Sequence, residues 1–259
     1  MRPAAIWNAG DYAAAGDRWA QASADLALDL AAPGRAVLDL ACGPGAFAIA
    51  AARAGARATG LDASPALLEL ARSRAAAAGV PVDWIEADMT AIPSPDDAFD
   101  TVASAFGCMF APDPAAMAAE MVRVCRPGGT VAALAWTPES AFGRMGPLAA
   151  DFLPSGPGAS PVARWERPES VAELFARLPV DLVCTEHVVE VAWDGFDQAV
   201  YEISELNPAW LAVRAAVEPS GRWPELVGRL GGLFAAHGRH EGSRFVLPVP
   251  YLRSTAALR

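Results

Sequence analysis

Residues 37–50 read VLDLACGPGAFAIA, and this stretch decides the fold. An apolar run with one aspartate stops at a Gly-x-Gly turn, and an alanine-rich helical pattern follows immediately. Open α/β sheets bind their ligands at such strand-to-helix turns. Glycine adopts positive φ and lets a ligand approach the backbone, while the helix N-terminus offers free N–H groups. We therefore expect Gly43 and Gly45 to cradle a nucleotide-like ligand, the alternative being a turn that binds nothing.

Strand and helix patterns alternate along the first half of the chain. The predicted strands cover residues 36–41, 57–62, 82–88, 100–106 and 130–136, and the predicted helices between them cover residues 46–55, 64–79 and 115–129. Single helices between strands imply right-handed crossovers and a parallel sheet. The sequence thus predicts an α/β fold with a doubly wound, Rossmann-like, mostly parallel seven-stranded sheet. Helices cover both faces of this sheet, and its last strand is antiparallel.

The composition excludes several classes of function. Hydrophobic residues make up 53% of the chain and charged residues 19%, which describes a folded globule. The net charge is −10 and no dense basic cluster offsets it. Nucleic acid is therefore not expected as a partner, because phosphate contacts need a basic surface. No apolar run reaches the roughly 18 residues that suggest a membrane span, so no membrane partner is expected.

The cysteines and the N-terminus indicate a cytoplasmic protein. The four cysteines are scattered, with no Cys-x-x-Cys pair, and are Cys42, Cys108, Cys125 and Cys184. We expect reduced thiols and neither zinc nor disulfides. Residues 1–20 contain two aspartates and lack an uninterrupted apolar centre, so they are not expected to form a secretory signal peptide.

Three aspartates follow or end three successive predicted strands. Asp39 precedes the glycine turn, where a negative charge disfavours a pyrophosphate but attracts an ammonium group. Asp62 can accept two ribose hydroxyls as a bidentate acceptor. Asp88 can accept a hydrogen bond from the exocyclic amine of adenine. A ligand with an amino group, a ribose and an adenine is S-adenosylmethionine.

The chain resembles the class I S-adenosylmethionine-dependent methyltransferases over residues 11–136. VLDLACGPG is similar to their first motif and GLDASPALLELA to their ribose segment. EADMTAIPSPDDAFDTV is similar to their adenine segment and fourth strand, and RVCRPGGTVAALAW to their fifth strand and the helix before it. Ala41 departs from the family, which usually has glycine there; alanine is tolerable if this backbone is not at positive φ.

The resemblance implies a set of cofactor-binding residues. These are Asp39, Ala41, Gly43 and Gly45 at the methionine end, Asp62 and Ala63 at the ribose, Asp88 and Met89 at the adenine, Ala105 and Phe106 under the methyl donor, and Tyr12 and Trp19 in an N-terminal segment that folds over the cofactor. Simpler roles remain open for five of them. Asp62 can cap the following helix and Asp88 can hold loop backbone, while Met89, Phe106 and Tyr12 can pack as ordinary core residues.

The acceptor is expected to be a small apolar or aromatic molecule, methylated on oxygen, carbon or nitrogen in natural-product biosynthesis. The chain lacks the Asn-Pro-Pro-Tyr-like segment of amine methyltransferases that act on DNA or protein glutamine. Candidate acceptor contacts are Met109, Phe110, Trp136, Trp165, Tyr201 and Trp210, each of which can instead belong to the core.

A general base is needed only for an acceptor that must lose a proton, and the sequence identifies none. Weak candidates are His187, His237, His240 and Tyr251. The spacing of His237 and His240 can suit a metal, but we expect a solvated loop there and no metal site.

We expect one methyltransferase domain over residues 1–259, as a monomer or homodimer. Residues 11–136, with a helical start at residues 11–30, form its cofactor-binding core. The substrate-side cap insertions are residues 137–182 and 194–250, and the last strands are residues 183–193 and 251–258. Pro248 and Pro250 argue against an ordinary central strand at residues 244–250.

Two other readings remain open. Ala48 completes a G-x-G-x-x-A pattern and Asp62 follows at roughly the right spacing, as in NAD(P)-dependent oxidoreductases. Asp39 and Asp88 oppose that reading. The second alternative is a methyltransferase fold repurposed for chemistry without methylation, such as a cyclisation.

Overall fold

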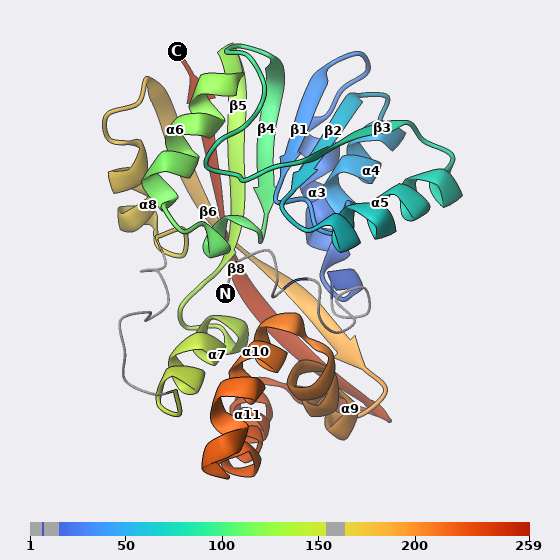
Figure 1. Cartoon of the computed structure of the whole chain (residues 1–259), viewed down its shortest axis with the longest axis vertical. Helices are drawn as coiled ribbons and strands as arrows, with labels where there is room; N and C mark the ends of the chain where they lie inside the picture. The colour runs from blue at the N-terminus through green and yellow to red at the C-terminus, as the bar shows by residue number, and fades with distance from the viewer. Residues whose placement is uncertain (1–6, 8–15, 154–163) are drawn as a thin grey trace. The chain divides into compact units, whose positions relative to one another are not determined.

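The computed structural model describes Trp7, residues 16–153 and residues 164–259 (Figure 1). The chain divides into two compact units. Unit 1 comprises Met1–Trp19, Trp136–Ser160 and Val188–Pro250, and unit 2 comprises Ala20–Ala135, Pro161–His187 and Tyr251–Arg259. The single domain expected over residues 1–259 stays a prediction, and each unit is described by itself. Tyr12 lies outside the described residues.

The sheet has the strand order β3-β2-β1-β4-β5-β8-β6. The strands are β1 (Ala36–Leu40), β2 (Arg57–Asp62), β3 (Val82–Glu86), β4 (Phe99–Ala105), β5 (Cys125–Trp136), β6 (Val180–Trp193) and β8 (Arg244–Leu258). The first five pair in parallel, and β8 is antiparallel to them (Figure 1). The predicted doubly wound fold is confirmed, since β1 is central and the strand order reverses beside it.

Two helical layers enclose the part of the sheet that belongs to unit 2. The helices are α3 (Ala20–Leu30), α4 (Ala46–Arg53), α5 (Pro65–Ala78), the 3-10 turn η1 (Cys108–Phe110), α6 (Pro114–Val124) and α8 (Pro168–Phe175). Helix α4 packs against α3 and α5, while α6 packs against α8. Right-handed crossovers in opposite directions from β1 and β4 place these two groups on opposite faces. The described residues contain no helix that is both long and apolar enough to cross a membrane.

Strand alternation divides the residues of β1 between the two layers. Leu38 and Leu40 belong to the core cluster that contains Met117 and Met121 of α6. Successive side chains of a strand point to opposite faces. Asp39 therefore faces the α4 layer, and this alternation brings a carboxylate under the glycine turn.

The start of α5 shows why the sequence folds as predicted there. Ser64 is the N-cap and its Oγ accepts a hydrogen bond from the Leu67 N–H at 3.3 Å. Pro65 occupies the first turn, where its missing N–H costs nothing, and Gly79 ends the helix at a φ of 67°.

Helix α6 and strand β5 meet earlier than predicted. The helix expected over residues 115–129 ends at Val124, and β5 begins at Cys125. The Pro-Gly-Gly segment lies inside the strand as an irregularity, where Gly128 has a φ of 73°. A β-carbon at Gly129 would stand 2.6 Å from Cys125 Sγ, so this bulge needs glycine.

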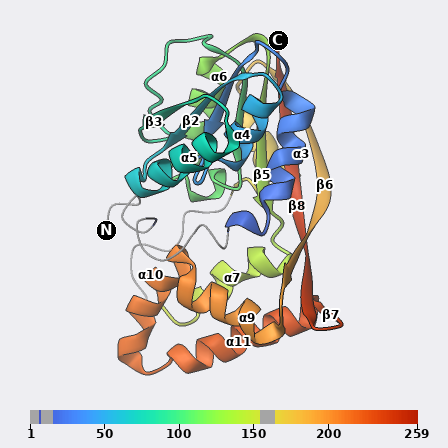
Figure 2. The same ribbon diagram turned by 90° about the vertical axis from the view of Figure 1, so that its right-hand side faces the viewer.

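The described part of unit 1 is mostly helical and also contains the adjoining ends of β5, β6 and β8. It contains α7 (Ala141–Ala150), α9 (Phe196–Tyr201), the π-helix η2 (Glu202–Leu206), α10 (Pro208–Val217), the 3-10 turn η3 (Glu218–Ser220), α11 (Trp223–His237) and the short strand β7 (Arg239–Glu241). Helices α9 and α11 lie side by side (Figures 1 and 2). Strand β7 was not predicted and gives the sheet an eighth strand, paired antiparallel with β8.

The start of β8 corrects a second boundary. The last strand runs over Arg244–Leu258 and includes both prolines, although the final strand was expected only from residue 251. Pro248 and Pro250 stand two residues apart, so their missing N–H groups face the same edge of the strand. Pro250 still accepts a hydrogen bond there from the Thr137 N–H at 3.2 Å, just beyond the end of β5.

A partly buried ion pair joins Arg18 to η2 within unit 1. Arg18 donates from Nε and Nη2 to the two carboxylate oxygens of Glu202, at 3.0 and 2.6 Å. It also donates to the Ala192 carbonyl, and its guanidinium lies over the Trp193 ring. Bidentate geometry stabilises an otherwise costly buried carboxylate, and Glu202 begins the π-helix η2.

Candidate functional site

The glycine turn has three residues in the left-handed region. The φ angles are 53° at Ala41, 51° at Gly43 and 83° at Gly45. The Gly45 N–H closes the turn by donating to the Cys42 carbonyl at 2.9 Å. Alanine at position 41 was expected to be tolerable if its φ was negative. The φ of Ala41 is positive, so that condition is not met. Ala41 therefore has the backbone strain of an L-residue at positive φ.

Asp62 binds two segments of backbone at once. Its Oδ2 accepts from the Gly43 N–H and its Oδ1 from the Ser64 N–H, both at 2.8 Å. The side chain is buried, and burial raises the pKa of this carboxyl although the hydrogen bonds lower it. The Ala63 backbone also hydrogen bonds to this carboxyl. A carboxylate has about four acceptor positions, so Asp62 orders the turn and still keeps acceptor capacity for a further donor such as a ribose hydroxyl.

Asp39 lies under the same turn. Its Oδ2 accepts from the Ala48 N–H of α4 at 3.0 Å, and the residue is only 2% exposed. Burial raises the pKa of Asp39 to about 7; the Ala48 hydrogen bond opposes that shift and the Asp62 charge adds to it. A cationic group placed against this carboxyl would favour its ionised form.

The loop after β4 meets the loop after β1. Phe106 has a φ of 65°, and its N–H donates to the Leu134 carbonyl at 3.0 Å. A β-carbon at Gly107 would stand 2.5 Å from Ala41 Cβ and 2.7 Å from the Ala41 carbonyl oxygen. Two strained residues, Ala41 and Phe106, therefore flank a contact that only glycine allows. Backbone strain of this kind concentrates at functional sites.

The adenine segment lies beside the ribose segment. The Ala87 N–H donates to the Asp62 carbonyl at 3.1 Å, which brings the residue before Asp88 against the end of β2. Asp88 is exposed and its Oδ1 accepts from the N–H and Oγ1 of Thr90, at 2.8 and 2.6 Å. Met89 packs against the core cluster. Asp88 therefore does hold loop backbone. Both hydrogen bonds from Thr90 go to its Oδ1, and neither goes to Oδ2.

The remaining candidates of unit 2 do not converge on one surface. Trp165 is 1% exposed and packs edge-on against Phe175, so it is a core residue rather than part of an open pocket. Met109 packs against the same core cluster, and Phe110 is 42% exposed. The ring of Phe106 meets Tyr251 edge-on, with 5.6 Å between the ring centroids.

The candidates of unit 1 separate into three places. Trp19 and Trp136 are buried and pack edge-on against each other and against Phe142. Trp210 is 3% exposed and packs against Trp223. Tyr201 is 57% exposed.

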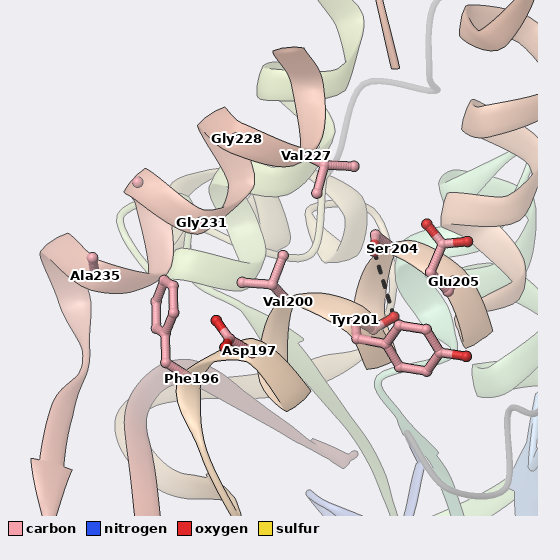
Figure 3. Close-up of a pocket in the computed structure, with 11 residues that line it drawn as sticks. Phe196, Asp197, Val200, Tyr201, Ser204, Glu205, Val227, Gly228, Gly231 and Ala235 are labelled. Carbon is pink, nitrogen blue, oxygen red and sulfur yellow. Dashed lines mark hydrogen bonds between the residues drawn. The ribbon is translucent and has the colours of Figure 1, made fainter. Parts of the chain in front are cut away.

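Tyr201 lines a pocket between α9, η2 and α11 (Figure 3). The pocket has a volume of about 620 Å³, and its lining is Phe196, Asp197, Val200, Tyr201, Ser204, Glu205, Val227, Gly228, Gly231, Gly232 and Ala235. Figure 3 shows Phe196 and Val200 on one side and the glycines of α11 on the other. The pocket combines an apolar wall with the side chains of Asp197 and Tyr201. Of the predicted acceptor residues, Tyr201 alone appears in this lining.

The three histidines have different surroundings. His187 is exposed, hydrogen bonds with Thr185 Oγ1 at 2.9 Å and stacks on Tyr251. His237 Nδ1 pairs with the Leu233 carbonyl, and His240 lies on β7 rather than in the expected loop. Within the described residues no group of three metal-ligating side chains comes together.

Sequence reasoning missed Gly107 as part of the site. The glycine directly follows the strained Phe106 at the carboxyl end of β4, the edge where ligands bind in open α/β sheets. Its place at the end of a predicted strand could have indicated Gly107 from the sequence. The contact between Gly107 and Ala41 could be seen only in the structure.

The chain is similar to several known proteins. A family model described as "Methyltransferase domain" matches residues 37–129. An uncharacterised protein of Mycobacterium tuberculosis is 38% identical over 206 residues, covering 78% of this chain and 75% of that protein. A demethylmenaquinone methyltransferase of Thermus thermophilus is 42% identical over 130 residues, covering 49% and 58% respectively. The crystal structure of the YcgJ protein of Bacillus subtilis shares the fold, with a TM-score of 0.64, 16% identity, and coverage of 92% and 99%.

The strain at Ala41 predicts opposite effects for two substitutions. Ala41→Gly should stabilise the protein by about 0.5–1 kcal/mol, because glycine adopts positive φ without the penalty of a β-carbon. Gly107→Ala should destabilise it by about 2 kcal/mol through overpacking against Ala41. Urea unfolding measures both. Equal losses of stability in the two variants would contradict the strain at Ala41.

The raised pKa of Asp39 predicts a pH-dependent stability. The native state holds this proton more tightly than the unfolded chain, so the contribution of Asp39 is greatest below pH 4 and is lost as pH rises through about 7. Asp39→Asn keeps an acceptor for the Ala48 N–H and removes the buried charge. The variant should exceed the wild type by about 2–4 kcal/mol at pH 8 and lose this advantage progressively as the pH falls to about 4. A stability difference that is constant with pH would contradict the prediction.

Proposed function

Because this chain belongs to the class I S-adenosylmethionine-dependent methyltransferases, we propose that it transfers a methyl group from S-adenosylmethionine to a small apolar or aromatic molecule. The observation that supports the cofactor best is the pair of buried carboxylates, Asp39 and Asp62, against one glycine turn. Such a pair suits a ligand with a cationic group and a diol, and it disfavours a dinucleotide pyrophosphate.

The residues present fit this cofactor. Gly43 and Gly45 leave the turn without side chains, and a β-carbon at Gly45 would meet atoms 2.7 Å away. Asp62 retains acceptor positions for ribose hydroxyls, and Asp39 offers a carboxyl that an ammonium group would ionise. We assign the methionine end to Asp39 and the turn, the ribose to Asp62 and Ala63, and the adenine to Asp88 and Met89.

Methyl transfer asks for alignment more than for acid–base chemistry. The bound sulfonium supplies an already activated methyl group, so the chain's own residues need chiefly to orient the reactants and exclude water. Ala105 and Phe106 serve this purpose in the proposal, at the strained end of β4. Tyr251 and His187 stack on one another and are the candidates to take a proton from an acidic acceptor.

The pocket of unit 1 is the proposed acceptor site. Gly228, Gly231 and Gly232 line it without side chains, and Phe196 and Tyr201 supply aromatic surface. Interior glycines each weaken a helix by about 1 kcal/mol relative to alanine. A β-carbon at Gly228 or Gly232 would meet nothing within 4 Å, so packing does not explain these two glycines. We attribute these two glycines to the need for space for a ligand in the pocket.

Three broader proposals accompany this function. We place the protein in the cytoplasm, working in natural-product biosynthesis as a monomer or homodimer. The buried free cysteines Cys42, Cys108 and Cys125 and the acidic composition support the first of these.

Product masses test the reaction. The protein is incubated with S-adenosylmethionine and a panel of phenols, quinones and aromatic amines, and products are measured by mass spectrometry. We expect S-adenosylhomocysteine together with a product that is heavier by one methyl substitution. An isomer of unchanged mass would instead support the repurposed fold, and tight binding of NAD(P)H without S-adenosylhomocysteine would overturn the cofactor.

Filling the pocket tests the acceptor site. Gly232→Leu should raise the KM for the acceptor at least fivefold and leave the dissociation constant of S-adenosylhomocysteine within twofold. Helix α11 should not lose stability, since leucine is a better helix former than glycine. Gly146→Leu on α7 is the control, because that glycine also has free space and does not line the pocket. An unchanged acceptor KM in Gly232→Leu would refute this placement.

A further inference from the structure

Trp84 touches the glycine turn from behind. It lies on β3 in parallel register with Gly60 of β2, and its side chain is half-buried. A β-carbon at Gly60 would stand 2.5 Å from Trp84 Cε3, so the indole ring rests directly on the β2 backbone. Any larger residue at position 60 would push the ring away from that strand.

The same ring reaches the turn itself. A β-carbon at Gly45 would stand 2.7 Å from Trp84 Cη2 and 3.3 Å from Cζ3. On α5, Ala71 Cβ would be 3.2 Å away. One side chain therefore packs against two glycines that are distant in sequence, and only hydrogen atoms separate the ring from either backbone.

The Gly45 backbone is held from two directions. Hydrogen bonds from the turn and α4 to Asp62 and Asp39 hold it on the carboxylate side. Gly45 is the N-cap of α4; its N–H donates to the Cys42 carbonyl and its carbonyl accepts from the Ile49 N–H, both at 2.9 Å. The ring of Trp84 adds a steric restraint on the remaining side, because it lies where a β-carbon of Gly45 would stand.

We infer that Trp84 is a positioning residue for the cofactor: its ring, seated on Gly60, fixes the place of Gly45 and thereby of the turn that receives the methyl donor. This inference rests on the proposed function for the identity of the ligand. Trp84 acts through Gly45. Loss of the ring opens a cavity directly behind the turn, and the turn then samples positions in which its groups no longer converge on the ligand.

Calorimetric titration with S-adenosylhomocysteine tests the role, at a temperature where every variant is folded by circular dichroism. Trp84→Leu should raise the dissociation constant at least tenfold, and the conservative Trp84→Phe should stay within threefold of the wild type. Phe99→Leu is the matched control. It removes a buried ring at the opposite end of β4 and should leave the dissociation constant within twofold.

Amide hydrogen exchange gives a readout that needs no ligand. Peptides spanning residues 40–50 should exchange at least tenfold faster in Trp84→Leu than in Phe99→Leu, if the ring restrains the turn. Gly60→Ala keeps the tryptophan but displaces its ring, and it should weaken binding and speed exchange in the same way. If Trp84→Leu does not fold, Gly60→Ala is used in its place.

Each negative outcome has its own meaning. A wild type that does not bind S-adenosylhomocysteine overturns the proposed function. A wild type that binds, with Trp84→Leu or Gly60→Ala binding equally well and exchanging no faster at residues 40–50, overturns the positioning role and leaves Trp84 as ordinary packing.

Discussion

The Asp62 carboxylate accepts one hydrogen bond from Gly43 and one from Ser64, and the geometry of the glycine turn in unit 2 depends on this arrangement. It joins the turn after β1 to the segment that starts α5. Asp39 performs the matching task on the other side by accepting from the Ala48 N–H of α4. Burial, with a smaller contribution from the nearby Asp62 charge, raises the pKa of Asp39 to about 7, so the ionised form of this carboxyl destabilises the protein. A ligand with a cation and a diol relieves that cost, which gives these residues a reason to be together.

Strain collects at the same edge of the sheet. Ala41 and Phe106 both adopt positive φ, and Gly107 fits between them only because it lacks a β-carbon. The packing behind the turn compensates for this strain. Trp84 rests on Gly60 and Gly45, so a rigid ring supports the glycine turn. A site with strained backbone and a rigid support holds its geometry before the ligand arrives, which is the condition for effective alignment.

Helix-end residues and the alternation of strands and helices were enough to predict much of the fold. Ser64, Pro65 and Gly79 mark the ends of α5, and the alternation of strands and helices predicted the doubly wound sheet. The prediction was wrong where proline and glycine, which were expected to end helices or exclude strands, lie inside a strand instead. Pro-Gly-Gly forms a bulge within β5, and the prolines of β8 stand where β5 has already ended.

Aromatic residues were the hardest to assign, because burial depends on tertiary packing: Trp165 and Trp210 are core residues, while Tyr201 is exposed on a pocket. The contact of Trp84 with two glycines was equally invisible, since it joins three separate segments.

The central claim is that the buried carboxylates beneath the glycine turn recognise a cationic adenosyl ligand. Calorimetry of S-adenosylhomocysteine binding at pH 7, in two buffers of different ionisation enthalpy, measures the protons exchanged on binding. The ligand's ammonium should ionise Asp39, so the wild type should release protons that Asp39→Asn does not release. Tight binding with the same proton balance in both proteins would contradict the claim.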